Sequence, residues 1–204
     1  MCGVVGYSSQ DPIDEHYSIL HKLIYQSKIR GLHSFGYSYC LNNKLTTRKY
    51  HNVDEVVLPQ ANKIVFHNRY ATSGDYQDHI NNQPITNNNL SLVFNGVLDM
   101  RTKVEMELHY GIKMQTYNDG EIILQKCGAN KDLLKDYIGN IKGSFAGLIL
   151  TASNELLAIR NSNRPLWRLS HSNAIFYAST KDIFKRVDKS FQPEQLKPNQ
   201  LYED

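Results

Sequence analysis

The chain opens with MCGVVGY at residues 1–7, and this stretch decides how the rest is interpreted. The apolar run after Cys2 predicts a short buried strand. If the initiator Met1 is removed, Cys2 carries both a thiol and a free α-amino group. Such an amine has an unperturbed pKa of about 7.7–8.0, so it can accept the thiol proton, as in enzymes with an N-terminal threonine. The alternative is that Cys2 is an ordinary core residue of the first strand.

Composition limits the class of protein. The chain has 204 residues, of which 41% are hydrophobic and 21% are charged, as in one globular domain. A net charge of +3 without a basic block gives no indication of nucleic-acid binding. Three isolated cysteines predict neither a disulfide framework nor a metal site. With no signal peptide and no membrane-length apolar segment, we expect a cytoplasmic location without a membrane anchor or cofactor.

Hydrophobic periodicity predicts an α+β fold with antiparallel sheets and helices packed outside them. A helix is expected to begin at Asp11-Pro12, with Asp11 as its N-cap, and to end at Gly31. The Asn42-Asn43 pair predicts a hairpin turn. The remaining expected strands are Lys63–Tyr70, Leu90–Phe94, Gly143–Thr151, Leu156–Arg160, Leu166–Ser170 and Ala174–Ala178, and the remaining expected helices are Gly120–Cys127, Lys131–Ile138 and Lys181–Val187.

Arg69 lies at the end of an expected strand that runs into a polar loop containing Thr72 and Gly74. A guanidinium in that position can bind a carboxylate through two parallel hydrogen bonds, and the Thr72 hydroxyl can donate another. The alternative for Arg69 is a surface salt bridge.

Two further polar features, the Asn95-Gly96 dipeptide and Asp119, each allow both a structural and a functional interpretation. Asn95-Gly96 follows the strand Leu90–Phe94 and is a tight-turn signal. Its amide groups can instead form an oxyanion hole. Asp119 precedes an expected helix, where it is either an N-cap or a carboxylate that binds a substrate ammonium. Together these residues offer a guanidinium for a carboxylate, a carboxylate for an ammonium group, and a thiol with an oxyanion hole for a carbonyl. An α-amino acid with a carbonyl at its far end fits this set, and glutamine is such a molecule.

In the order in which they occur, these motifs resemble the class II glutamine amidotransferase domain, whose nucleophile is an N-terminal cysteine. The resemblance covers essentially the whole chain. The segments that carry it are Cys2-Gly3-Val4-Val5-Gly6, the stretch from Arg30 to Gly36, the stretch from His67 to Gly74, Asn82-Gln83-Pro84-Ile85, which resembles the segment that closes the glutamine loop, Phe94-Asn95-Gly96-Val97, Asn118-Asp119-Gly120-Glu121, Gly143-Ser144-Phe145-Ala146, Arg160-Asn161 with Arg164-Pro165-Leu166-Trp167, and Leu196-Lys197-Pro198-Asn199-Gln200.

The resemblance implies a four-layer αββα sandwich of the N-terminal-nucleophile hydrolase type, spanning residues 1–204 as one glutaminase domain. It also implies that L-glutamine is hydrolysed through a γ-glutamyl thioester on Cys2. Asn95 and Gly96 would form the oxyanion hole. Arg69 and Thr72 would bind the α-carboxylate of glutamine, and Asp119 its α-ammonium.

Three functions stay open at this point. The first is a stand-alone glutaminase that supplies ammonia to a separate synthase subunit, since the chain ends where fused relatives continue. The second is a hydrolase of another amide, which would keep Cys2 and the oxyanion hole but would not need Arg69 and Asp119 together. The third is a non-catalytic interaction subunit, which retention of Met1 would favour.

Overall fold

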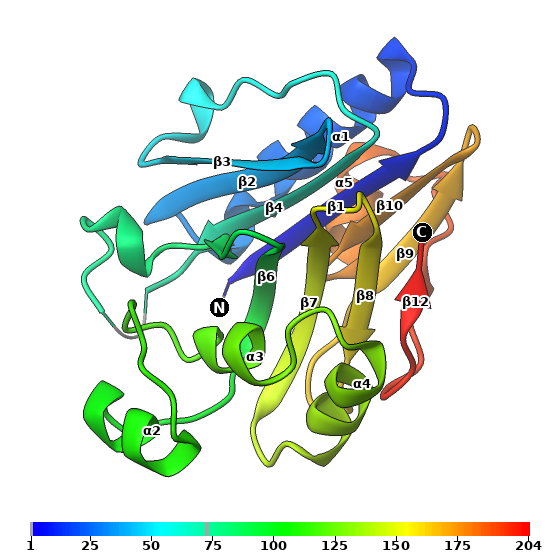
Figure 1. The fold of residues 1–204 in the computed structure, drawn as a ribbon. Coiled ribbons are helices and arrows are strands. Elements are labelled where there is room, and N and C mark those ends of the chain that lie inside the picture. Colours follow the sequence, from blue (N-terminus) through cyan, green and yellow to red (C-terminus); the bar gives the residue numbers. More distant parts are fainter. Residues whose placement is uncertain (1, 72–73) are drawn as a thin grey trace.

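The computed structural model describes residues 2–71 and 74–204, which form two antiparallel sheets packed face to face (Figure 1). The larger sheet holds, in spatial order, β11 (Glu194–Gln195), β9 (Trp167–His171), β10 (Ala174–Ala178), β1 (Gly3–Ser9), β4 (Lys63–Arg69), β2 (Ser34–Leu41) and β3 (Lys44–Tyr50). The smaller sheet holds β12 (Tyr202–Glu203), β8 (Leu156–Arg160), β7 (Ser144–Thr151), β6 (Leu90–Val97) and β5 (Ile85–Thr86).

Helices cover the outer faces of both sheets. The α-helices are α1 (Asp14–Ser27), α2 (Lys103–Tyr110), α3 (Glu121–Lys126), α4 (Lys131–Asn140) and α5 (Lys181–Val187). Three short 3₁₀ turns are η1 (Lys28–Arg30), η2 (Val53–Glu55) and η3 (His79–Asn81). Buried apolar side chains join α1 and α5 to the larger sheet, and a second cluster joins α3 and α4 to the smaller one. The predicted αββα layering is therefore confirmed.

A third apolar cluster fills the space between the two sheets, with Val4 and Val65 on one side and Val93 and Leu148 on the other. Consecutive residues of a strand point to opposite faces. Val4 therefore faces the other sheet, while Val5 faces the outer helices. This alternation places the start of β1 within the sandwich, close to the end of β6 (Figure 1).

Several expected elements differ from the structure at their ends. The Asn42-Asn43 turn is confirmed, with φ values of 52° and 58° that match the left-handed turn of a two-residue hairpin. The predicted N-cap at Asp11 is wrong, because α1 begins at Asp14 after Ile13. The strand predicted to stop at Phe94 continues to Val97, because Asn95 and Gly96 still pair with β7.

Helix α2 was not among the predicted elements. It begins with a capping box, in which the Thr102 hydroxyl accepts from the backbone of Glu105 and the Glu105 carboxylate accepts from the backbone of Thr102. That Thr-x-x-Glu pattern was the available signal. Within the described residues, no helix has the length and apolar character needed to cross a membrane.

Candidate active site

One cavity of about 320 Å³ opens between the N-terminus, the end of β4, the end of β6 and the loop before α3. Its lining includes four of the predicted site residues, namely Cys2, Arg69, Gly96 and Asp119. Asn95 is the immediate neighbour of Gly96 but is not itself part of the lining. The predicted contribution of Thr72 falls outside the described residues. Residues far apart in the sequence therefore share one pocket.

The Cys2 sulfur lies at the edge of this cavity and donates to the carbonyl oxygen of Tyr70 at 3.6 Å. Burial raises the pKa of the Cys2 thiol, against the charges of Arg69 and Arg30, which lower it. A thiol with a raised pKa is protonated near neutral pH. It needs a proton acceptor before it can act as a nucleophile.

The segment from Arg30 to His33 connects Cys2 to the end of β4. Arg30 Nε donates to the carbonyl oxygen of Cys2 at 3.3 Å. The backbone nitrogen of His33 donates to the carbonyl oxygen of Arg69 at 3.0 Å, and His33 Nδ1 accepts from the backbone of Ala71 at 2.8 Å. At Gly31 a Cβ atom would overlap the backbone of Arg69, so only glycine permits this approach. No role at the site was predicted for Arg30 or His33.

Arg69 is 5% exposed, so the alternative of a surface salt bridge is wrong. Its Nη1 donates to Asn82 Oδ1 at 2.5 Å, and its Nη2 donates to the carbonyl oxygen of Gly74 at 3.4 Å. Both acceptors belong to the loop that follows β4. The guanidinium is therefore attached to this loop at the wall of the cavity.

Asp119 is half-buried, and its Oδ2 accepts from the backbone nitrogens of Leu98 and Asp99 at 2.6 and 3.1 Å. The N-cap of α3 is Gly120, whose own nitrogen is bound by Asn118 Oδ1. The expected alternative of Asp119 as an N-cap is therefore wrong. Burial raises the pKa of the Asp119 carboxyl, and its backbone hydrogen bonds oppose that shift.

Asn95 and Gly96 lie within β6, so the alternative of a tight turn is also wrong. Asn95 is 3% exposed, and within the described part of the chain its Nδ2 has no hydrogen-bond partner. A buried donor of this kind is uncommon. A Cβ on Gly96 would overlap the carbonyl oxygen of Ser144, which explains the glycine.

Gln83 supports this part of β6 and was not predicted to do so. Its Oε1 accepts from the backbone nitrogen of Phe94 at 2.6 Å, beyond the two residues of β6 that pair with β5. The Phe94 N–H therefore points away from β7. Because backbone directions alternate along a strand, the Gly96 N–H two residues further on points to the same edge, where Gly96 lines the cavity.

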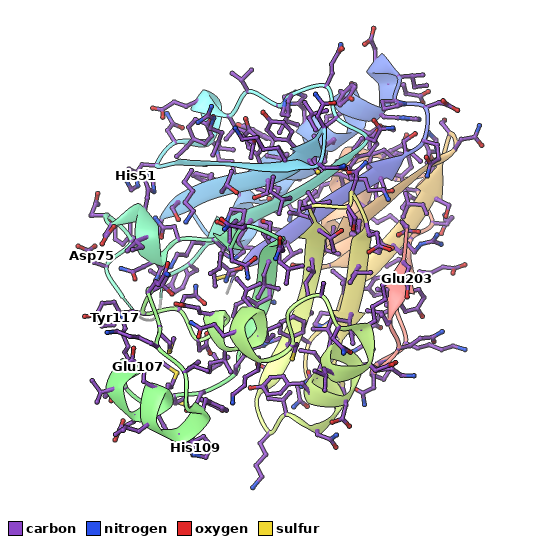
Figure 2. The ribbon with its side chains drawn as sticks, in the orientation of Figure 1. His51, Asp75, Glu107, His109, Tyr117 and Glu203 are labelled. Atoms are coloured by element: carbon purple, nitrogen blue, oxygen red, sulfur yellow. The ribbon has the colours of Figure 1, made fainter. Side chains whose placement is uncertain are left out.

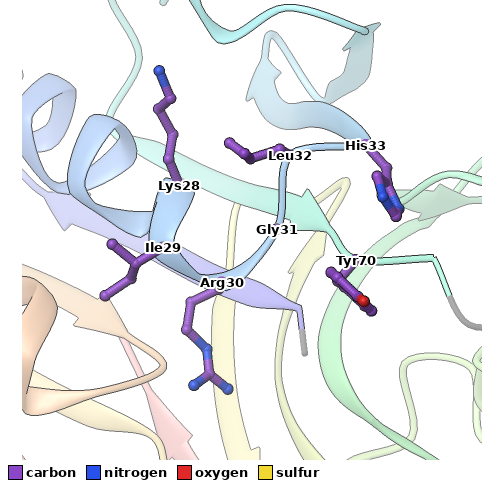
Figure 3. A pocket seen from close by; sticks show the side chains of 7 residues that line it. All are labelled: Lys28, Ile29, Arg30, Gly31, Leu32, His33 and Tyr70. Atoms are coloured by element: carbon purple, nitrogen blue, oxygen red, sulfur yellow. The ribbon is translucent and has the colours of Figure 1, made fainter.

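A second depression of about 350 Å³ lies beside the first and is formed by residues 28–33 together with Tyr70 (Figure 3). Tyr70 lines both. In Figure 3 the Arg30 side chain leaves the segment on the side opposite to Lys28. Arg30 lines this second depression and donates to the carbonyl oxygen of Cys2, so it connects the depression to the backbone of the candidate nucleophile.

Across residues 2–71 and 74–204, no group of three or more His, Cys, Asp or Glu side chains has the arrangement of a metal site. The three cysteines are free thiols, and Cys40 and Cys127 are buried. The side chains that line the cavity carry the Cys2 thiol, two guanidinium groups, two carboxylates and the amides of Gln83 and Asn118.

The glutamine amidotransferase domain family matches residues 67–186. The chain belongs to this family, and its fold and opening cysteine place it among the class II, N-terminal-nucleophile members. Glutamine–fructose-6-phosphate aminotransferase of Helicobacter pylori is 28% identical in an alignment of 207 positions, which covers 93% of this chain and 34% of that protein. Amidophosphoribosyltransferase of Bacillus subtilis is 27% identical in an alignment of 220 positions, which covers 98% of this chain and 45% of that protein.

Solved structures agree with the assignment of the fold. A structure described as the allosteric regulatory enzyme of purine biosynthesis has a TM-score of 0.80 at 26% identity, over 99% of this chain and 46% of the other. The glutamine phosphoribosylpyrophosphate amidotransferase of B. subtilis has a TM-score of 0.76 at 23% identity, over 99% and 47%. The chain therefore spans less than half the length of these relatives.

Proposed function

We propose that the protein hydrolyses the side-chain amide of L-glutamine at Cys2. The observation that carries this proposal is the shared cavity, in which a thiol, a buried guanidinium and a half-buried carboxylate face one volume. These groups match the electrophilic amide, the α-carboxylate and the α-ammonium of one amino acid. The cavity volume of about 320 Å³ is at the small end of ligand sites.

In the proposed reaction, the free α-amine of processed Cys2 takes the thiol proton. The thiolate then attacks the amide carbon. Asn95 Nδ2 and the Gly96 N–H donate to the oxyanion that forms. Collapse of this intermediate expels ammonia, which leaves with the proton from the amine, and forms a γ-glutamyl thioester. A water molecule, deprotonated by the same amine, then hydrolyses the thioester to glutamate and restores the thiol.

We further propose that the ammonia passes to an acceptor on a synthase domain or subunit. Support comes from the names of the relatives, which describe transfer to fructose 6-phosphate and to a phosphoribosyl compound. Ammonia released into solvent would be protonated and would no longer be nucleophilic. Direct transfer to the acceptor keeps it unprotonated. Co-purification from native cells, followed by mass spectrometry of the untagged partner, tests this point.

The test of catalysis begins with intact-mass spectrometry of the purified protein. The measured mass should correspond to the chain without Met1. Incubation with L-glutamine should give glutamate and ammonia in equal amounts, with much slower turnover of asparagine and N-acyl amides. A diazo-ketone glutamine analogue should label Cys2. Cys2→Ala should abolish turnover, whereas the matched control Cys40→Ala, at a buried thiol outside the cavity, should retain it. Absence of labelling in protein that lacks Met1 would refute the proposal.

A further inference from the structure

A chain of hydrogen bonds leads from Arg69 into the interior of the loop that follows β4. Its first member is Asn82, which is 0% exposed and accepts from Arg69 Nη1 at 2.5 Å. A guanidinium carries only donors. The Asn82 atom that faces Arg69 must therefore be the oxygen, and this requirement fixes the orientation of the whole amide.

The amide nitrogen of Asn82 then faces two groups. One is the carbonyl oxygen of Tyr76 at 2.8 Å, and the other is Nδ1 of His79 at 3.1 Å. An amide nitrogen only donates. His79 Nδ1 must therefore accept, which requires a neutral imidazole whose proton is on Nε2. Arg69 thus determines the tautomer of a histidine two hydrogen bonds away.

The surroundings of His79 favour this neutral form. Its ring stacks on that of His51 at a centroid distance of 4.2 Å and an angle of 15°, and Lys49 Nζ donates to the His79 carbonyl oxygen at 2.8 Å. Burial, His51 and Lys49 lower the pKa of His79, and Asp78 opposes them. Figure 2 shows His51 at the end of β3, beside the loop that carries Asp75.

We propose that neutral His79 is a positioning residue, which holds Arg69 through Asn82 in the orientation that binds the α-carboxylate of glutamine. Glutamine affinity then falls as His79 becomes protonated. This inference rests on the proposed function, because it concerns the same carboxylate site. It assigns a hydrogen-bonding role to Asn82, which lies in a segment that carries the family resemblance, and it adds His79 and His51, for which no role was predicted.

The direction of the pH effect follows from the donors. Protonation adds a hydrogen to Nδ1, so two donors face each other and either Asn82 or His79 must turn away. When Asn82 turns, Arg69 Nη1 loses the acceptor that Asn82 Oδ1 provides. If only the form with neutral His79 binds, the apparent Kd rises in inverse proportion to the neutral fraction, by about tenfold at one pH unit below the pKa of free His79.

The experiment measures L-glutamine binding by calorimetry, with the full chain carrying Cys2→Ala so that no turnover occurs. The quantity compared is the ratio of Kd at about pH 5 to Kd at about pH 7.5, values that bracket the ordinary histidine pKa. This ratio should fall markedly when His79→Gln is added, because a glutamine side chain offers an acceptor that does not titrate. The control His21→Gln, on the exposed side of α1, should keep the parent ratio. Titration of Asp119 affects all three proteins equally.

Equal ratios with and without His79→Gln would overturn the inference while leaving glutamine binding intact. Absence of binding at about pH 7.5 in the Cys2→Ala parent would instead overturn the proposed function, and the inference with it. Nitrogen-15 NMR of the imidazoles gives a second readout that needs no ligand. We expect His79 to carry its proton on Nε2 near neutral pH, and a neutral form protonated on Nδ1 would refute the inference.

Discussion

Arg30 Nε donates to the carbonyl oxygen of Cys2 across 3.3 Å, so the 3₁₀ turn after α1 holds the backbone of the candidate nucleophile. The same segment bonds to the carbonyl oxygen of Arg69 through His33. One short loop therefore sets the spacing between the thiol and the carboxylate-binding guanidinium. Cys2 and Arg69 are both far from Arg30 in the sequence.

Replacement of Arg30 by methionine should lower kcat more than it raises KM for glutamine. A hydrogen bond from a charged group contributes about 1.5–3 kcal/mol, which corresponds to a loss of about ten- to a hundredfold in rate. Steady-state glutaminase assays measure both constants. The control Arg48→Met, at an exposed arginine of β3, should leave them unchanged. A rise in KM alone would show that Arg30 does not position the nucleophile.

Asn95→Ala should lower kcat by about 10²–10³ with little change in KM, because the proposed bond forms only when the oxyanion develops. The unpartnered buried Nδ2 of Asn95 is the observation behind this expectation. Single-turnover measurement of thioester formation isolates the step. Asn88→Ala, at an exposed asparagine before β6, is the matched control. An unchanged rate of thioester formation would exclude Asn95 from the oxyanion hole.

Asp119→Asn should raise KM for glutamine by about tenfold or more, since it removes the negative charge proposed to bind the ammonium. Only the ionised carboxylate binds the ammonium, so kcat/KM should fall as the pH decreases through the pKa of Asp119. Burial raises that pKa, so the fall begins at a higher pH than for an ordinary Asp, whose pKa is about 3.9. The pH profile of Asp119→Asn is measured in the His79→Gln background, so that protonation of His79 does not contribute to it. An unchanged acidic fall in kcat/KM there would belong to a group other than Asp119.

Gly31→Ala should destabilise the protein by about 1–3 kcal/mol, because the new Cβ overlaps the backbone of Arg69 and forces it to move. Urea unfolding measures this change. The comparison variant is Gly139→Ala in α4, where the nearest side-chain atom lies 3.8 Å from the new Cβ. That change should stabilise by about 0.5–1 kcal/mol. Equal stabilities for the two variants would contradict the close approach at Gly31.

The layered fold and most of its strands were predictable because they depend on local signals. Alternating apolar residues predict the core strands, and Asn42-Asn43 adopts the left-handed conformation that its turn requires. The position of Cys2 directly ahead of an apolar strand is likewise a local signal, and the structure places Cys2 in the lining of the cavity; its role as a nucleophile stays a prediction. Asn95-Gly96 was ambiguous, since the same dipeptide suits a turn and a strand end, and only its pairing with β7 decided between them.

The supporting residues were not predictable, because each acts on a partner that lies far away in the chain. Gln83 completes the sheet beside Phe94 only because β5 stops short, and Arg30 meets Cys2 only because α1 returns to the start of β1. In the proposed network, Arg69 sets the tautomer of His79 through Asn82. A sequence specifies which side chains can donate or accept, but packing of distant segments determines which donor meets which acceptor.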